Sequence, residues 1–168
     1  MRAISLTQPW ATLIALGAKR LETRSWSTPY HGPLAIHAAK GLGEYSLADL
    51  IALCRRPIFQ RALALGGYAH FEALPRGGIV AVGQLSHCVI MSDSDIPASL
   101  YPRFARRAEQ ERAFGCYAPG RWAWVIDNVR ALADPIPARG QLALWEWTPP
   151  ANLLDLLHVS RETPEPTP

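Results

Sequence analysis

The sequence predicts an α+β fold: a small, mostly antiparallel β-barrel with an N-terminal helix at its side and a helical insertion. Three observations lead to this prediction. Five or six short segments have strand-like patterns, one helical pattern lies near the start, and a second helical block follows residue 43. A composition of 49% hydrophobic and 18% charged residues in a chain of 168 is typical of a globular protein with its own core.

The first part of the chain has signals for one helix between short strands. A helix is expected over 9–16, because Pro9 is tolerated in a first turn and Gly17 is a common C-terminal stop. The strands expected here are 3–8, 20–26 and 33–39.

A helical insertion is expected over about 41–75. Its pattern runs over 44–66, and Pro57 should divide it into two helices. Residues 92–120 are the least regular part of the chain, with a short helix expected in "RFARRAEQERAF" (103–114).

The later strands follow. Residues 74–91 form a turn and a long β-branched strand, apolar on both faces and therefore central. Another strand is expected over 121–132, then a proline-rich bend and a last strand within 134–147. Residues 1–150 should form a single domain, and 151–168 a short helix and a disordered tail.

Several classes of protein do not fit. No run reaches the ~18 to 20 apolar residues of a membrane helix, and the N-terminus lacks a signal-peptide pattern. The three cysteines are scattered, without metal-ligand spacing, so neither a metal, a cofactor nor a disulfide framework is expected, and the location should be cytoplasmic. A net charge of +3 is compatible with a polyanionic partner.

The basic residues are unevenly chosen: 15 of the 17 are Arg, and only Lys19 and Lys40 are Lys. Either this is chance, or these two positions need a compact ammonium group that a planar guanidinium cannot replace.

Strand alternation over 20–26 places four large polar or aromatic side chains on one side: Arg20, Glu22, Arg24 and Trp26. One interpretation is a solvated face in which Glu22 pairs with a neighbouring arginine. The other is the wall of a site, because Trp26 is unusual in solvent and the opposite face is hardly apolar. Arginine and an indole together suit a phosphate or a base.

Other candidates lie near this strand. The Gln8 amide can both donate and accept, as base-edge readers do. His37 is either a satisfied core histidine or a functional one, and the two interpretations weigh equally. Glu111, in "RRAEQER", taken alone is typical of a solvated helix. The four tryptophans of the later strands are expected in the core: Trp122, Trp124, Trp145 and Trp147.

Three blocks carry a resemblance to a known family: "LTQPWATLIALGAKRLETRSW", "GPLAIHAAK" and "GRWAWVIDNVRALADPIPARGQLALWEW". They resemble the ASCH (activating signal cointegrator homology) family of the PUA-like superfamily. This resemblance implies a β-barrel with a cleft beside the first helix, where members are thought to bind nucleic acid. The family pattern falls on Gln8, Pro9, Trp10, Gly17, Lys19, Glu22, Arg24, Trp26 and His37.

An enzymatic branch of the family is also similar. Its members hydrolyse N4-acetylcytidine with a Gly-x-Lys-x-x-Thr motif and an Ala-Glu-Gln-Glu segment, and others are described as ribonucleases. Here Lys19 matches, Glu22 takes the place of the threonine, and Thr23 comes one residue late, which turns it to the opposite face. "AEQE" occurs at 108–111.

Two functions follow as expectations. The first is binding of nucleic acid, RNA above all, or of a modified nucleoside, in a polar cleft between helix 9–16 and strand 20–26. Its binding residues are Gln8, Trp10, Lys19, Arg24, Trp26, His37 and Lys40. The alternative is a hydrolase acting on RNA or an acylated nucleoside, with Lys19 and Glu22 as acid and base. Weaker catalytic candidates are Thr23, His37 and Glu111. DNA and a protein partner stay open.

Overall fold

A computed structural model describes residues 1–151 and 153, so the terminal helix and tail expected over 151–168 lie almost entirely outside the described residues. The strands are β1 (Arg2–Leu6), β2 (Leu21–Arg24), β3 (Gly32–Ala38), β4 (Gly78–Ile90), β5 (Trp122–Pro137) and β6 (Leu144–Glu146). The helices are α1 (Trp10–Ala15), α2 (Leu47–Cys54), α3 (Pro57–Ala64), α4 (Tyr101–Phe104) and α5 (Ala108–Phe114). Two 3-10 turns, η1 (Phe71–Ala73) and η2 (Ala105–Arg107), complete the elements.

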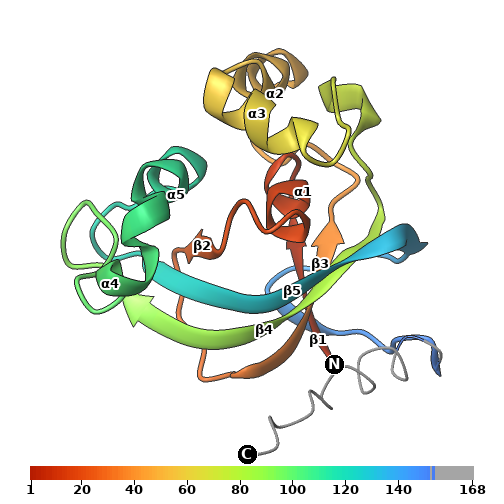
Figure 1. Ribbon diagram of the computed structural model, residues 1–168. Helices are drawn as coiled ribbons and strands as arrows, with labels where there is room; N and C mark the ends of the chain where they lie inside the picture. Colours follow the sequence, from red (N-terminus) through yellow and green to blue (C-terminus); the bar gives the residue numbers. More distant parts are fainter. Residues whose placement is uncertain (152, 154–168) are drawn as a thin grey trace, which may run out of the picture.

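The strands form one mixed sheet of six in the order β2-β5-β4-β3-β1-β6. Among the described strands only β1 and β3 pair in parallel, so the expectation of a mostly antiparallel sheet is confirmed. The β4–β5 ladder contains three register irregularities, and such bulges bend a strand and increase its twist. The sheet therefore curls into a half-barrel, with α1 against its concave side (Figure 1).

Helix α1 is buried on two sides. Ala11 and Ile14 pack into the core on the sheet, which contains Ile36 and Trp124. Leu13, on another side of the helix, packs in a second cluster built mainly from α2 and α3. This short helix depends on tertiary packing, since isolated helices of this length are not stable in water.

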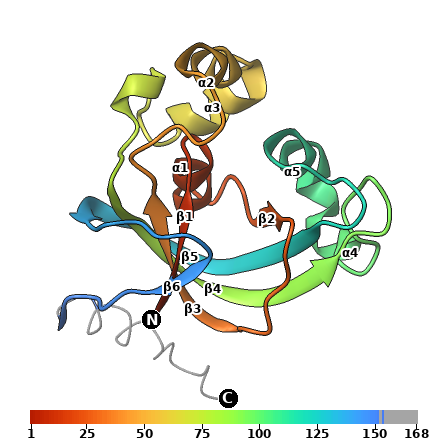
Figure 2. The same cartoon turned by 180° about the vertical axis from the view of Figure 1, so that it is seen from behind.

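The helical insertion has the predicted division. Pro57 is the first residue of α3, where its missing N–H costs no hydrogen bond. Ser46 caps α2, its Oγ accepting from the Asp49 backbone N–H at 3.1 Å. Both helices lie over α1, on the side away from the sheet (Figures 1 and 2).

The expected proline-rich bend at 134–137 is wrong. These residues continue β5, with Ile136 and Pro137 opposite Ile79 and Gly78 of β4. Strand β2 pairs with β5 only as far as Val125, so this end of β5 is a free edge. Proline is tolerated at an edge because no ladder hydrogen bond is lost there.

The core tryptophans are placed as expected in three of four cases: Trp124, Trp145 and Trp147 are buried, and Trp122 is half-buried. No helix in the described part of the chain is long and apolar enough to cross a bilayer.

Candidate functional site

A cavity of about 500 Å³ lies between α1, β2 and the loop that follows β3. We call it the α1–β2 cavity. The polar and aromatic residues that line it are Ser5, Thr7, Trp10, Glu22, Thr23, Arg24, Glu44, Tyr45, Phe59, Phe114, Cys116 and Arg121. It lies where the sequence predicts a polar cleft, between helix 9–16 and strand 20–26.

One wall of the α1–β2 cavity is aromatic. Trp10 begins α1, and its ring lies 5.2 Å from that of Tyr45, centroid to centroid, with 38° between the planes. Trp10 is half-buried and Tyr45 exposed, so the pair leaves aromatic surface open to solvent. Such a surface can stack against a planar ring of any base.

The opposite wall is charged and comes from β2. Arg24 Nε lies 3.2 Å from Glu22 Oε1, and the Arg24 guanidinium also donates to the Ser5 carbonyl at 3.2 Å. The interpretation in which Glu22 pairs with an arginine is therefore correct, yet the pair lines a cavity and is not a solvated face. Antiparallel pairing of β2 with β5, Glu22 opposite Trp124, sets its register.

Arg121 adds a second cation at this wall. Its guanidinium donates to the Thr23 carbonyl at 2.9 Å, while its Nε is buried without a hydrogen-bond partner among the described residues. Sequence reasoning did not select Arg121 or Tyr45. Both are far from the motif along the chain, and nothing in their local pattern separates them from other surface residues.

Lys19 lies beneath Glu22 and is not among the residues that line the cavity. It is only 1% exposed, its Nζ lies 3.5 Å from Glu22 Oε2, and it donates a hydrogen bond to the Leu21 carbonyl. Glu22 thus connects the buried ammonium group to the cavity.

Glu111 lies on the other side of this segment and is completely buried, so the expectation of a solvated helix is wrong. Its carboxylate accepts from the backbone N–H groups of Arg20 at 2.9 Å and Leu21 at 3.1 Å. Burial raises the pKa of Glu111, and the Lys19 charge and the two N–H donors oppose that rise. The "AEQE" segment therefore ties α5 to the start of β2.

Thr23 is buried on β2, and its Oγ1 accepts from the Cys116 backbone N–H at 3.2 Å. The expectation that the face of β2 that carries Leu21 and Thr23 is hardly apolar is wrong at Leu21. Leu21 is completely buried in a cluster with Phe104 and Val125, because α4 and α5 cover that face.

Three other residues that the sequence suggests for this site do not line the α1–β2 cavity and have other contacts. Gln8 is buried, with its Nε2 donating to the Pro75 carbonyl and its Oε1 accepting from the Thr12 N–H. Trp26 packs edge-on against Trp124, 4.6 Å between centroids. Arg20 turns away from Glu22 and pairs with Asp127.

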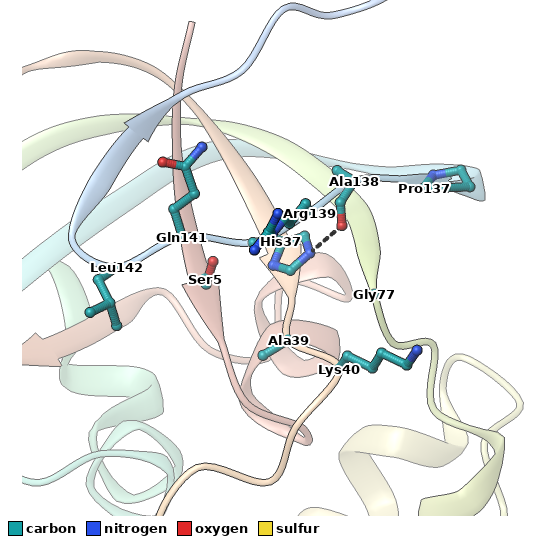
Figure 3. Close-up of a pocket in the computed structure, with 11 residues that line it drawn as sticks. Ser5, His37, Ala39, Lys40, Gly77, Pro137, Ala138, Arg139, Gln141 and Leu142 are labelled. Atoms are coloured by element: carbon teal, nitrogen blue, oxygen red, sulfur yellow. Dashed lines mark hydrogen bonds between the residues drawn. The ribbon is translucent and has the colours of Figure 1, made fainter.

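His37 and Lys40 belong to a second cavity of about 790 Å³ between β3, β1 and the loop from β5 to β6 (Figure 3). We call it the His37 cavity. His37 Nε2 lies 3.1 Å from the Ala138 carbonyl oxygen, and Nδ1 has no hydrogen-bond partner among the described residues. Burial lowers the pKa of His37. Neutral His37 therefore donates from Nε2 to the Ala138 carbonyl, while its buried Nδ1 has no partner among the described residues, so only one of its two ring nitrogens is satisfied.

No group of three or more His, Cys, Asp or Glu residues in the described part of the chain is arranged to hold a metal ion.

A curled, mostly antiparallel sheet with a helix against its concave side, and an aromatic and charged cavity between them, define a small half-barrel domain with a ligand-sized cavity. The chain belongs to the ASCH domain family, whose model matches residues 4–135. This is a PUA-like family that has been proposed to bind RNA.

Curated relatives include Activating signal cointegrator 1 of Homo sapiens and of Mus musculus. Over 145 residues, 85% of this chain, the identity is 45% to the human and 54% to the mouse protein. The chain spans only 22% of the length of each relative. Among solved structures, the crystal structure of ASCH from Zymomonas mobilis has a TM-score of 0.48 and 17% identity, with 94% of each chain covered.

Proposed function

We propose that this domain binds a nucleotide of single-stranded RNA, or a modified nucleoside, in the α1–β2 cavity. The observation that carries the proposal is that an aromatic pair, two arginines and a carboxylate line one cavity. Its volume of about 500 Å³ is within the range of known small-molecule sites. Membership of the ASCH family supports the same class of ligand.

Each wall has a part in this proposal. The base stacks on Trp10 and Tyr45, whose rings face the cavity. Glu22, held between two cations, accepts hydrogen bonds from amino or imino groups of the base. Arg121 also lines the cavity, and its guanidinium has further N–H groups besides the one that donates to the Thr23 carbonyl, which can donate to base or phosphate oxygens.

The test is fluorescence anisotropy with labelled RNA pentamers of each base, and competition by free nucleosides, N4-acetylcytidine included. Trp10→Ala should weaken binding by roughly 5- to 150-fold, the range expected for loss of one stacked base at ~1–3 kcal/mol. Arg121→Ala should weaken it and reduce its dependence on salt. Arg61→Ala, an exposed arginine of α3 that does not line this cavity, is the control.

Two outcomes would overturn the proposal. In the first, Trp10→Ala binds RNA with the same Kd as wild type; in the second, wild type does not bind any of these ligands. In the second case a protein partner becomes the leading hypothesis. DNA pentamers of the same sequences decide between RNA and DNA.

One observation favours a second candidate, hydrolysis of RNA or of an acylated nucleoside. The Lys19–Glu22 pair is buried, and its Glu22 end opens on the α1–β2 cavity. In this candidate the pair moves a proton to or from an attacking water or ribose 2′-OH. Glu22→Gln keeps the shape of the side chain and should abolish turnover of short RNA or N4-acetylcytidine. Because it also breaks the buried pair with Lys19, its turnover is measured at a temperature where urea unfolding shows the variant to be folded. No turnover by the wild type removes this candidate.

We further propose that residues 1–150 act as one domain in the cytoplasm. The three cysteines support the location, because Cys54, Cys88 and Cys116 are all free thiols.

A further inference from the structure

We propose that the His37 cavity holds the phosphate next to the base in the α1–β2 cavity, so that the natural ligand is an oligonucleotide and not a free nucleoside. This inference rests on the proposed function. It assigns a role to Lys40 and to Arg139, which lies in the loop between β5 and β6 (Figure 3).

The two cavities adjoin one another. Ser5, Ala39 and Leu142 line both of them. A ligand that fills the first cavity therefore meets the second without leaving the protein surface. In an oligonucleotide, the group directly attached to a bound nucleoside on either side is a phosphate.

The charge of the His37 cavity fits a phosphate. Lys40 and Arg139 line it, and its lining includes no Asp or Glu. Both cations are exposed, and neither forms a hydrogen bond or ion pair with another residue in the described part of the chain. Ammonium and guanidinium groups are the cationic groups with which proteins commonly bind phosphate.

The loop that carries Arg139 is held in place against the sheet. Gly140 lies so close to β1 and β3 that a Cβ there would come within 2.4 Å of His37 Cε1 and 2.8 Å of Ser5 Oγ. His37 also donates to the Ala138 carbonyl, at the start of the same loop (Figure 3). Because the loop is fixed at these points, the backbone that carries Arg139 needs little ordering when the ligand binds, and only the Arg139 side chain has to adopt one conformation.

Leu142 lies where the two cavities meet, and it is 94% exposed. A chain that continues into the His37 cavity would cover it with a ribose or a neighbouring base.

The experiment measures Kd for one nucleoside, its 3′- and 5′-monophosphates, and trinucleotides with that nucleoside at the centre. The proteins are wild type, the double variant Lys40→Ala/Arg139→Ala, Trp10→Ala, and the exposed-arginine control Arg61→Ala. For wild type we expect the trinucleotide to bind at least tenfold more tightly than the nucleoside. The double variant should lose most of this advantage, with a salt slope smaller by about 0.7, the contribution of one neutralised phosphate on a single strand. Its Kd for the nucleoside should stay at the wild-type value.

The outcomes separate the two proposals. If the trinucleotide binds the double variant as tightly as wild type, while Trp10→Ala still weakens it, the phosphate site is wrong and the base site stands. If wild type binds the nucleoside and the trinucleotide equally, the inference is likewise overturned. If wild type binds none of these ligands, both proposals fall. The double variant should also weaken binding of one of the two monophosphates. Whether this is the 3′- or the 5′-monophosphate shows on which side of the bound base the phosphate lies, and so the direction of the RNA chain.

Discussion

Lys19 and Glu22 form a buried ion pair, with Nζ 3.5 Å from Oε2, where the chain passes from α1 into β2. The Lys19 backbone N–H donates to the Leu13 carbonyl of α1 at 3.0 Å, while Glu22 is paired within the sheet. The Lys19–Glu22 ion pair therefore connects the end of α1 to β2. One member of the pair is sealed inside and the other lines the α1–β2 cavity.

This burial predicts that Lys19→Ala will strongly destabilise the fold. Its removal leaves the carboxylates of Glu22 and Glu111 without their common cation, and breaking a buried pair costs about 3–5 kcal/mol. Urea unfolding should show this loss in the free energy of unfolding. Lys40→Ala is the matched control, because Lys40 is exposed and should change stability by less than ~0.5 kcal/mol.

A cost below ~1 kcal/mol for Lys19→Ala would mean that the pair contributes little to the fold. Lys19→Arg is no milder a variant, because a 1% exposed site has no room for a larger guanidinium group. Loss of activity in any Lys19 variant must therefore be compared with its stability.

Glu111→Gln should destabilise the protein by about 1–3 kcal/mol. The Glu111 carboxylate accepts from two backbone N–H groups with its two oxygens, and a glutamine amide would turn an N–H₂ toward one of them. Thermal and urea unfolding measure the change. Glu109→Gln, on an exposed position of the same helix, should have almost no effect, and equal effects would contradict the anchoring role of Glu111.

Gly140→Ala should displace the loop between β5 and β6. The added methyl group would lie 2.4 Å from His37 Cε1, so the loop or the ring must move, at a typical cost of about 1–3 kcal/mol. Gly41→Ala is the control, because a Cβ there meets nothing within 4 Å. NMR chemical shifts of the His37 ring should change in the first variant only; an unchanged ring environment in Gly140→Ala would refute the close approach.

His37 should make the protein less stable in mild acid. Burial lowers its pKa in the folded state, so below its ordinary value of about 6.5 the unfolded chain takes up a proton that the folded chain refuses. This contribution is complete above pH 6.5 and is lost as the pH falls toward the folded pKa, with a slope of at most ~1.4 kcal/mol per pH unit. The hydrogen bond to the Ala138 carbonyl opposes this lowering of the His37 pKa but does not cancel it.

The measurement is urea unfolding at pH 5, 6, 7 and 8 for wild type and His37→Gln. The difference between the two proteins should shrink as the pH falls, while the effect of Glu111 is common to both and cancels. A difference that does not vary with pH would show that His37 titrates alike in both states.

Local signals located most of the elements well. Helix 9–16 and the division at Pro57 follow from proline geometry and helical spacing, and the structure has α1 over Trp10–Ala15 and α3 from Pro57 onward. Which side chains line the cavity was predicted less well. Alternation assigns Trp26 to the side of Glu22, but Trp26 packs against Trp124 and does not line the cavity.

The sequence by itself determined the order and type of most elements and the resemblance to the ASCH family, because periodicity, turn residues and motif spacing are local properties of the chain. The tertiary structure alone decided which charged groups are sealed in and which line a cavity. Tyr45, Glu111 and Arg121 meet β2 from distant parts of the chain, and only the packing of α5 and the insertion against the sheet brings them there. Burial depends on what covers a strand, and no pattern within the strand records it.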